Sequence, residues 1–322
     1  MPFVRALSAV VLLALAVANI AAGEDFPARP VRVVVPQIPG GASDALARIV
    51  GQKLGEQWRV QLVTDNRGGA GGNIGTDIVA RSPANGYTWL VTYEGTYAIN
   101  ATLYRHLPFD SRKDFAAVAA LATVPFIMVV NNNLPANTLA QFISVARAKP
   151  GELNYGAANG AVNHLIGVML DRLASIKTVH VPYRGAADSL TDTISGVMQV
   201  NYASLPSAVG LVRAGRVRAV AVTSEKRALA LPEVPTIAES GFPGFDIAPW
   251  FGIFTRAGTP QQLIRKINAD INALLKQKDV IDRFANLGAE PFITTPEQFT
   301  RIAHRDIEKW STVVKASGAT LD

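Results

Sequence analysis

A loop of small, uncharged residues is the first segment of this sequence that could hold a ligand. Residues 36–44 read P-Q-I-P-G-G-A-S-D, follow an apolar run rich in β-branched residues and lead into a stretch with helical spacing. Glycines let backbone N–H groups approach a ligand closely, and Ser43 is a common helix-capping residue type. Because a helix start presents free N–H groups and about half a positive charge, this loop suits a carboxylate. An ordinary strand-to-helix turn has the same composition, so this loop alone does not establish binding.

Two later loops repeat the pattern. Residues 155–161 read Y-G-A-A-N-G-A, and residues 183–187 read Y-R-G-A-A. Three such loops, divided between two parts of the chain, predict a cleft that holds an organic anion from two sides. The residues predicted to bind the ligand from these loops are Gln37, Gly41, Ala42, Ser43, Asn159, Gly160, Ala161, Asn163, His164, Arg184, Gly185 and Ala186.

Aromatic residues near strand ends are candidates to form a pocket wall around an apolar ligand body. They are Tyr93, Tyr97, Tyr202 and Trp250, although core positions would explain the same residues. Tyr93 and Tyr202 directly follow strand patterns, so the predicted site includes them together with the neighbouring Gly95 and Ser204.

The glycine-rich segment 66–75, N-R-G-G-A-G-G-N-I-G, does not match a nucleotide-binding motif. Counted from Gly69, the dinucleotide fingerprint needs glycine at position 74, where the sequence has Ile74. The sequence also contains no Gly-Lys dipeptide, which excludes a P-loop. We interpret this segment as a flexible turn at the edge of the cleft.

Catalytic and metal motifs are also missing from the sequence. The histidines are His106, His164, His180 and His304, and none stands in an H-x-x-x-H or H-E-x-x-H pattern. A triad of His164 with a serine and an aspartate would need a G-x-S-x-G nucleophile turn, which is absent. We therefore predict no enzyme activity, no metal and no cofactor.

The N-terminus has the composition of an export signal. One arginine precedes the apolar run 6–20, and small residues 21–23 end it. This predicts a signal peptide over residues 1–23, cleaved near Gly23, because the run is shorter than the roughly 20 residues of a membrane span. The predicted location is the periplasm. The sequence has no cysteine, so its core must hold the fold without disulfides.

Basic residues are scattered along the chain, although the net charge is +6. Nucleic-acid-binding proteins concentrate such residues on one face. We expect no nucleic-acid partner, and we expect a monomer.

Apolar runs and helical patterns alternate along the rest of the chain, which predicts an α/β protein built from βαβ units around parallel sheets. A second set of elements begins near residue 125, so the chain forms two units and passes between them more than once. The expected strands are 31–35, 60–63, 87–92, 126–130, 153–155, 178–181, 197–201, 217–223 and 250–254, and the expected helices are 44–55, 74–80, 138–149, 163–174, 187–195 and 260–276.

These segments together match a known family. Besides the loops above, the match includes residues 85–87 (N-G-Y), 97–104 (Y-A-I-N-A-T-L-Y), 180–185 (H-V-P-Y-R-G), 205–208 (L-P-S-A) and 309–322. From about residue 26 onward the chain resembles the substrate-binding proteins of tripartite tricarboxylate transporters, the Bug family.

The resemblance implies a two-domain periplasmic-binding-protein fold, the "Venus flytrap", with the ligand cleft between the domains. Residues 24–125 plus 225–322 would form domain 1, and residues 126–224 domain 2. It also implies capture of a small organic carboxylate for membrane permease subunits. The carboxylate would be held by backbone N–H groups, hydroxyls and water.

Four positions depart from the family pattern. The family commonly has phenylalanine at Gln37, serine or threonine at Ala42 and Ala161, and a smaller residue or phenylalanine at Tyr202. These changes leave the solute open between a dicarboxylate and an aromatic carboxylate. Two alternatives remain at this point, namely a periplasmic sensing module for a receptor and a periplasmic hydrolase.

Overall fold

The computed structural model describes residues 26–183 and 186–321. The predicted signal peptide and the candidate residues Arg184 and Gly185 lie outside this range. Ala186 is placed as the first residue of a helix.

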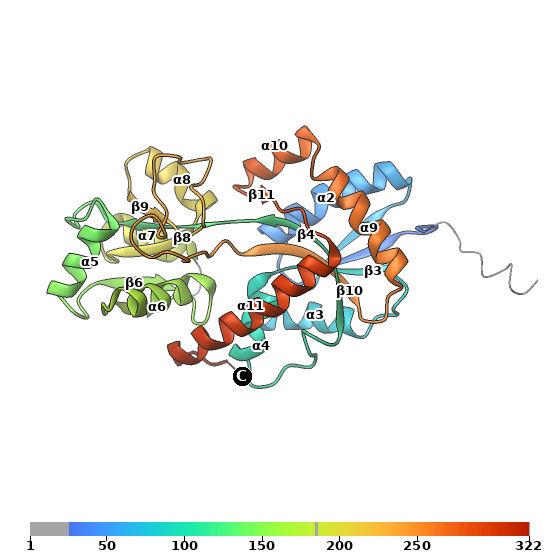
Figure 1. The fold of residues 1–322 in the computed structure, drawn as a ribbon, viewed down its shortest axis with the longest axis horizontal. Helices are drawn as coiled ribbons and strands as arrows, with labels where there is room; N and C mark the ends of the chain where they lie inside the picture. The colour runs from blue at the N-terminus through green and yellow to red at the C-terminus, as the bar shows by residue number, and fades with distance from the viewer. Residues whose placement is uncertain (1–25, 184–185, 322) are drawn as a thin grey trace, which may run out of the picture.

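The chain forms two β-sheets with helices packed around each (Figure 1). We call each sheet with its helices a lobe. The six-stranded sheet of the first lobe has the order β11-β4-β10-β3-β1-β2, and the five-stranded sheet of the second lobe has the order β7-β6-β8-β5-β9. The first lobe contains β1 (Val31–Val35), β2 (Leu62–Asn66), β3 (Thr88–Tyr93), β4 (Phe115–Thr123), β10 (Trp250–Arg256) and β11 (Glu290–Pro291), and the second contains β5 (Phe126–Val130), β6 (Asn154–Ala157), β7 (Val179–Pro182), β8 (Val200–Ser204) and β9 (Arg218–Val222).

The helices follow the same division. The first lobe has α2 (Ala42–Trp58), α3 (Asn73–Ala80), α4 (Asn100–Leu103), α9 (Gln261–Leu274), α10 (Lys278–Asn286) and α11 (Pro296–Ser317), with the short turns η1 (Ala70–Gly72) and η2 (Gly95–Ile99), and the second has α5 (Leu139–Ala148), α6 (Val162–Ala174), α7 (Ala186–Ser195) and α8 (Leu205–Arg213). Among the described residues, no helix combines the length and apolar character that crossing a membrane requires.

Both sheets contain the expected parallel pairs, but both are mixed, because each also contains antiparallel pairs. In the first lobe β1 pairs in parallel with β2 and β3, but β10 runs antiparallel to β3 and β4. In the second, β6 is parallel to β7 and β8, but β5 is antiparallel to β8 and β9. Apart from β11, which is antiparallel to β4, the reversed strands are β5 and β10, each of which receives the chain as it crosses between the lobes, from β4 to β5 and later from β9 to β10. The two passages between sheets therefore introduce the reversed direction.

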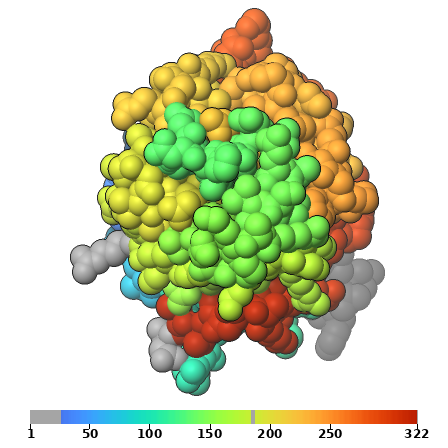
Figure 2. All heavy atoms as spheres, turned by 90° about the vertical axis from the view of Figure 1, so that its left-hand side faces the viewer, coloured from blue at the N-terminus to red at the C-terminus, as the bar shows by residue number. Residues whose placement is uncertain are grey.

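Helix α11 contacts both lobes. It starts with a capping box, in which Thr295 and Gln298 bond each other's backbone N–H, and its last turn ends at Gly318 with φ +70°. Buried Trp310 and Val314 of α11 share one apolar cluster with Leu165 of α6. Figure 1 shows α11 running beneath the connecting strands toward α6, and Figure 2 shows it along the lower edge of the second lobe. The lobes are thus joined on this side by an apolar interface as well as by the chain itself.

Candidate ligand-binding site

A cleft of about 470 Å³ lies between the two lobes. Its described lining contains no charged side chain. The first lobe contributes Gly40, Gly41, Ala42, Ala45, Tyr93, Phe251, Asn286 and Leu287, the second contributes Phe126, Val162, Ser204, Pro206 and Ser207, and the connecting segments contribute Val124 and Pro249.

The start of α2 faces this cleft from the first lobe. Its N-cap, Gly41, is extended and has no side chain to bond the first turn. The N–H groups of that turn have no intrahelical partner, so they can bind an anion. Asp44 lies in the same turn, but its Oδ2 accepts the Gly40 N–H at 3.0 Å and both of its oxygens accept the Arg48 guanidinium. Although burial opposes ionisation, these bonds hold the pKa of Asp44 below its usual value.

The start of α8 faces the same cleft from the second lobe. Ser204 is its N-cap, and its side chain accepts no backbone N–H of the first turn. The Ser204 and Ser207 hydroxyls lie 3.0 Å apart, and Ser207 Oγ donates to the Ser204 carbonyl at 2.7 Å. The first turn of α8 offers fewer N–H groups than that of α2, because Leu205 donates its N–H to the Pro125 carbonyl at 2.9 Å and Pro206 has none. Two helix starts without side-chain caps, one from each lobe, nevertheless meet one uncharged space.

Aromatic side chains form one wall of the cleft. Tyr93 and Phe251 are opposite each other on the antiparallel strands β3 and β10, and their rings stack with centroids 5.8 Å apart. Burial raises the pKa of the Tyr93 hydroxyl, so it is neutral at pH 7. Phe126 adds an aromatic ring from the second lobe. This wall suits an apolar ligand body.

The second predicted loop, residues 155–161, is held at its end by two histidines. Gly160 donates its N–H to His164 Nδ1 at 3.1 Å, and the His164 ring stacks on His180 with centroids 3.8 Å apart. His180 Nε2 lies 2.9 Å from the Ala157 carbonyl. Burial and the neighbouring His180 lower the pKa of His164 to about 4, which keeps its ring neutral and able to accept. Gly160 has φ +72°, and a Cβ there would lie 2.5 Å from Leu103 of α4. This loop therefore packs against the first lobe.

The structure brings only part of the predicted residue set to the cleft. Gly41, Ala42, Tyr93 and Ser204 line it. Gln37 donates to Thr96 Oγ1 at 3.0 Å, Ser43 is buried on α2, and Gly95 begins the turn η2 beneath the Tyr93 ring. Asn159, Gly160, Ala161, Asn163 and His164 belong to the loop held by the histidines, and of this region Val162 reaches the cleft.

Tyr202 requires a correction. Its side chain is 1% exposed, and its ring packs edge-on against Tyr155 within the second lobe. Tyr97 and Trp250, the other aromatic candidates, are also buried in the core. Strand position alone did not tell which face of the sheet each ring would occupy.

Several lining residues were not predicted from the sequence. Phe126 and Phe251 are strand residues adjacent to the crossovers, and Asn286 and Leu287 end α10, a helix that the sequence reading did not recognise. The spacing of Val280, Phe284 and Leu287 at i, i+4 and i+7 was the available signal for that helix.

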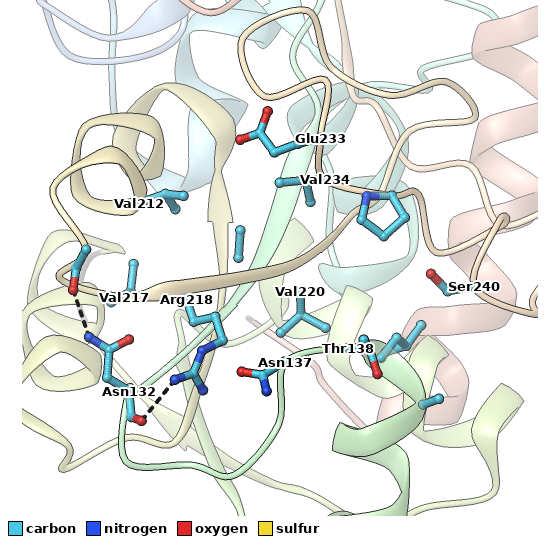
Figure 3. A pocket seen from close by; sticks show the side chains of 15 residues that line it. Asn132, Asn137, Thr138, Val212, Val217, Arg218, Val220, Glu233, Val234 and Ser240 are labelled. Carbon is cyan, nitrogen blue, oxygen red and sulfur yellow. Dashed lines mark hydrogen bonds between the residues drawn. The ribbon is translucent and has the colours of Figure 1, made fainter.

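A larger groove, about 740 Å³, lies at the outer edge of the second lobe beside β9 (Figure 3). Arg218 lines this groove, and its guanidinium group donates to the backbone oxygens of Leu134 at 3.0 Å and Asn132 at 3.3 Å. The groove is open and is lined by the second lobe and the segment that follows β9. It cannot hold a ligand from two lobes, so the interlobe cleft is the candidate site.

Metal-binding geometry is missing from the described part of the chain, where no group of three or more His, Cys, Asp or Glu residues comes together.

Two mixed α/β lobes around an uncharged cleft define the periplasmic-binding-protein fold. Residues 46–319 match the family model described as "Tripartite tricarboxylate transporter family receptor". The chain belongs to this family, whose members are solute-binding receptors and not enzymes.

Individual relatives cover nearly the whole chain. Protein BugT of Bordetella pertussis is 34% identical over 320 residues, which is 98% of each chain. The solved structure described as "R. palustris Rpa4515 with adipate" is 36% identical, with a TM-score of 0.79 over 92% of this chain and 100% of the other. MatC (Rpa3494) from Rhodopseudomonas palustris with bound malate is 31% identical, with a TM-score of 0.73 over 90% and 100% of the two chains.

Proposed function

We propose that this protein captures a small organic carboxylate in the interlobe cleft and delivers it to the permease subunits of a tripartite transporter. The observation that carries the proposal is the pair of helix starts, at Gly41 and Ser204, that face one uncharged cleft from different lobes. Relatives whose structures hold adipate and malate support it.

Binding would work by closure of the two lobes. In this proposal residues 24–125 plus 225–322 form one domain and residues 126–224 the other. They turn about the short link at Val124 and the longer segment after β9. Closure removes water from the cleft, and the lower local dielectric strengthens the N–H···carboxylate bonds. The Tyr93–Phe251 wall accepts the carbon skeleton of the solute.

We further propose that the protein works in the periplasm as a monomer, after removal of residues 1–23. Intact-mass measurement of the protein isolated from periplasm checks the cleavage site. A mature N-terminus near Glu24 is expected, and retention of residues 1–23 would contradict export with release.

A melting experiment with a length-matched, uncharged probe tests the ligand class. Adipate, malate and benzoate are compared with adipamide, which has the length of adipate but no charge. A ligand at 100 times its Kd that binds only the folded state stabilises by about 2.7 kcal/mol, so at least one acid should raise Tm by about 5 °C. A response to adipamide with none to any acid would contradict the proposal. Mass spectrometry of the recovered acid should find it unchanged, and a product would place the protein among enzymes.

A further inference from the structure

The last residue of α10 and the two residues after it, Asn286–Gly288, include the part of the cleft wall that the ligand proposal leaves unused. We call it the α10 turn. Val280 and Phe284 of α10 are buried in the apolar cluster of the first lobe, together with residues of α2 and α9. The helix therefore has a fixed base, and its last turn reaches the cleft with Asn286 and Leu287.

Asn286 carries an uncommitted amide. Its side chain is exposed in the cleft and makes no hydrogen bond to any residue that the structure describes. The hydroxyls of Ser204 and Ser207, by contrast, already bond each other. Asn286 thus has both a donor and an acceptor free on the cleft side of the first lobe.

Gly288 brings the α10 turn against the second lobe. Its φ is +61°, and a Cβ there would lie 2.4 Å from Cγ of Pro206, a cleft-lining residue of α8. Figure 1 shows α10 and α8 on the side of the connecting strands opposite to α11. The lobes therefore meet across the cleft here, away from the apolar interface of α11.

We propose that Asn286 is a specificity-determining residue, which donates a hydrogen bond to a ligand oxygen outside the carboxylate bound at the helix starts. Gly288 lets the α10 turn close onto Pro206 over the bound molecule. The inference rests on the proposed function and narrows its solute to acids with a second oxygen group, such as diacids and hydroxy acids. This preference follows from closure of the lobes, which buries the Asn286 amide. A ligand that leaves the buried amide without a hydrogen-bond partner binds more weakly. Acids without the second oxygen group should bind about 10-fold more weakly or worse.

Matched acid pairs test Asn286. Calorimetric titration of the mature protein uses adipate with hexanoate, malate with butyrate, and 4-hydroxybenzoate with benzoate. For at least one pair, the wild type should bind the acid with the second oxygen group at least about 10-fold more tightly than the acid without it. Asn286→Ala should reduce that preference to less than about 3-fold, because the acid with the second oxygen group loses a hydrogen bond and the other acid no longer buries an unpaired amide. Asn286→Asp should weaken a diacid further, since two carboxylates then face each other.

Ala285→Asp is the control for the charge. Ala285 is exposed, adjacent to Asn286, and not in the cleft lining, so this variant should keep the wild-type preference. If the acids bind and the affinity ratio within each pair is the same in Asn286→Ala as in the wild type, the inference is overturned and the proposed function remains intact. A protein that binds none of the six acids would contradict the proposed function itself.

Two glycine variants test closure of the α10 turn. Gly288→Ala and Gly215→Ala introduce the same backbone strain, because φ is +61° and +64°, but nothing lies within 4 Å of a Cβ at Gly215. Gly288→Ala should weaken every bound acid about 10-fold and reduce the ligand-induced decrease in radius of gyration measured by X-ray scattering. Gly215→Ala should change neither. Equal behaviour of the two variants would show that the contact with Pro206 takes no part in closure.

Discussion

The two lobes contain the same turn in different surroundings. In the first lobe Gly40 donates its N–H to Asp44 Oδ2 at 3.0 Å, and in the second Gly160 donates to His164 Nδ1 at 3.1 Å. Each acceptor lies four residues after its glycine, and both glycines have positive φ, +88° and +72°. Each turn ends at an N-cap that makes no side-chain bond, Gly41 for α2 and Ala161 for α6.

The neighbours of these turns differ. Nothing lies within 4 Å of a Cβ placed on Gly40, and Gly40 lines the cleft. The same atom on Gly160 would meet Leu103 of the other lobe. A glycine-rich loop at a helix start can therefore serve a ligand or an interlobe contact. The residues packed around the loop decide which.

Alanine substitutions at the two glycines should have unequal effects on stability. Both variants force an L-residue into the left-handed region, which costs about 1 kcal/mol. At Gly160 the added methyl also overpacks against Leu103, for about 1–3 kcal/mol more. Chemical denaturation of the ligand-free protein should give losses of about 2–4 kcal/mol for Gly160→Ala and about 1 kcal/mol for Gly40→Ala. Equal losses would mean that the Gly160 turn is as open as the Gly40 turn.

The two acceptors should respond to different pH ranges. Burial and His180 lower the pKa of His164 from 6.5 to about 4. The unfolded chain then takes up a proton before the folded protein does, so stability falls as the pH drops from 6.5 toward 4. His164→Asn retains an oxygen acceptor for the Gly160 N–H without titrating. The free energy of unfolding of this variant, measured from pH 7 to pH 4, should decrease less steeply than that of the wild type.

Asp44 provides the contrast, because hydrogen bonds from Arg48 and Gly40 outweigh its burial and lower the pKa of its carboxyl. Its contribution to stability is present above pH 3.8, the usual value, and is lost only below it. Asp44→Asn should therefore leave the slope between pH 6.5 and 4.5 unchanged. A slope that disappears with Asp44→Asn and persists with His164→Asn would contradict the assignment.

Sequence periodicity located most of the elements near the cleft. The strands 31–35 and 126–130 were predicted with the bounds that they have, and the strand that begins at 250 extends two residues beyond its predicted end. Strand β2 lies two residues later than expected at its start. These elements are short apolar runs bounded by turn residues, a pattern that local composition specifies well.

The elements that were not recognised have weak or ambiguous local patterns. Strand β4 reads F-A-A-V-A-A-L-A-T, and alanine is depleted in strands, so only its pairing with β10 and β11 explains its conformation. Helices α8, α10 and α11 were also missed, although each has regular apolar spacing. The consequence for the site was larger for α8 and α10, because Pro206, Ser207, Asn286 and Leu287 of the cleft lining could not be placed without them.

The glycine loops show the limit of sequence reading for the site. Their composition correctly places both at helix starts, but the contact of Gly160 with Leu103 joins residues 57 positions apart in different lobes. The burial of Tyr202 against Tyr155 is likewise a contact between strands, absent from any local pattern.

Serine substitutions at the two N-caps give the smallest expected effects and the sharpest comparison of the turns. Neither Gly41 nor Ala161 caps its helix with a side chain. Ala161→Ser supplies a cap to α6 and should stabilise by about 1 kcal/mol, seen as a Tm increase of about 2 °C. Because Ala161 is not in the cleft lining, the affinity for a bound acid should not change.

Gly41→Ser should change stability by only a few tenths of a kcal/mol. Its hydroxyl would occupy an N–H group of α2 that the ligand needs, so the affinity should fall severalfold. If Ala161→Ser altered the affinity and Gly41→Ser did not, the carboxylate would be bound by the Gly160 turn, and the assignment of the two turns would have to be exchanged.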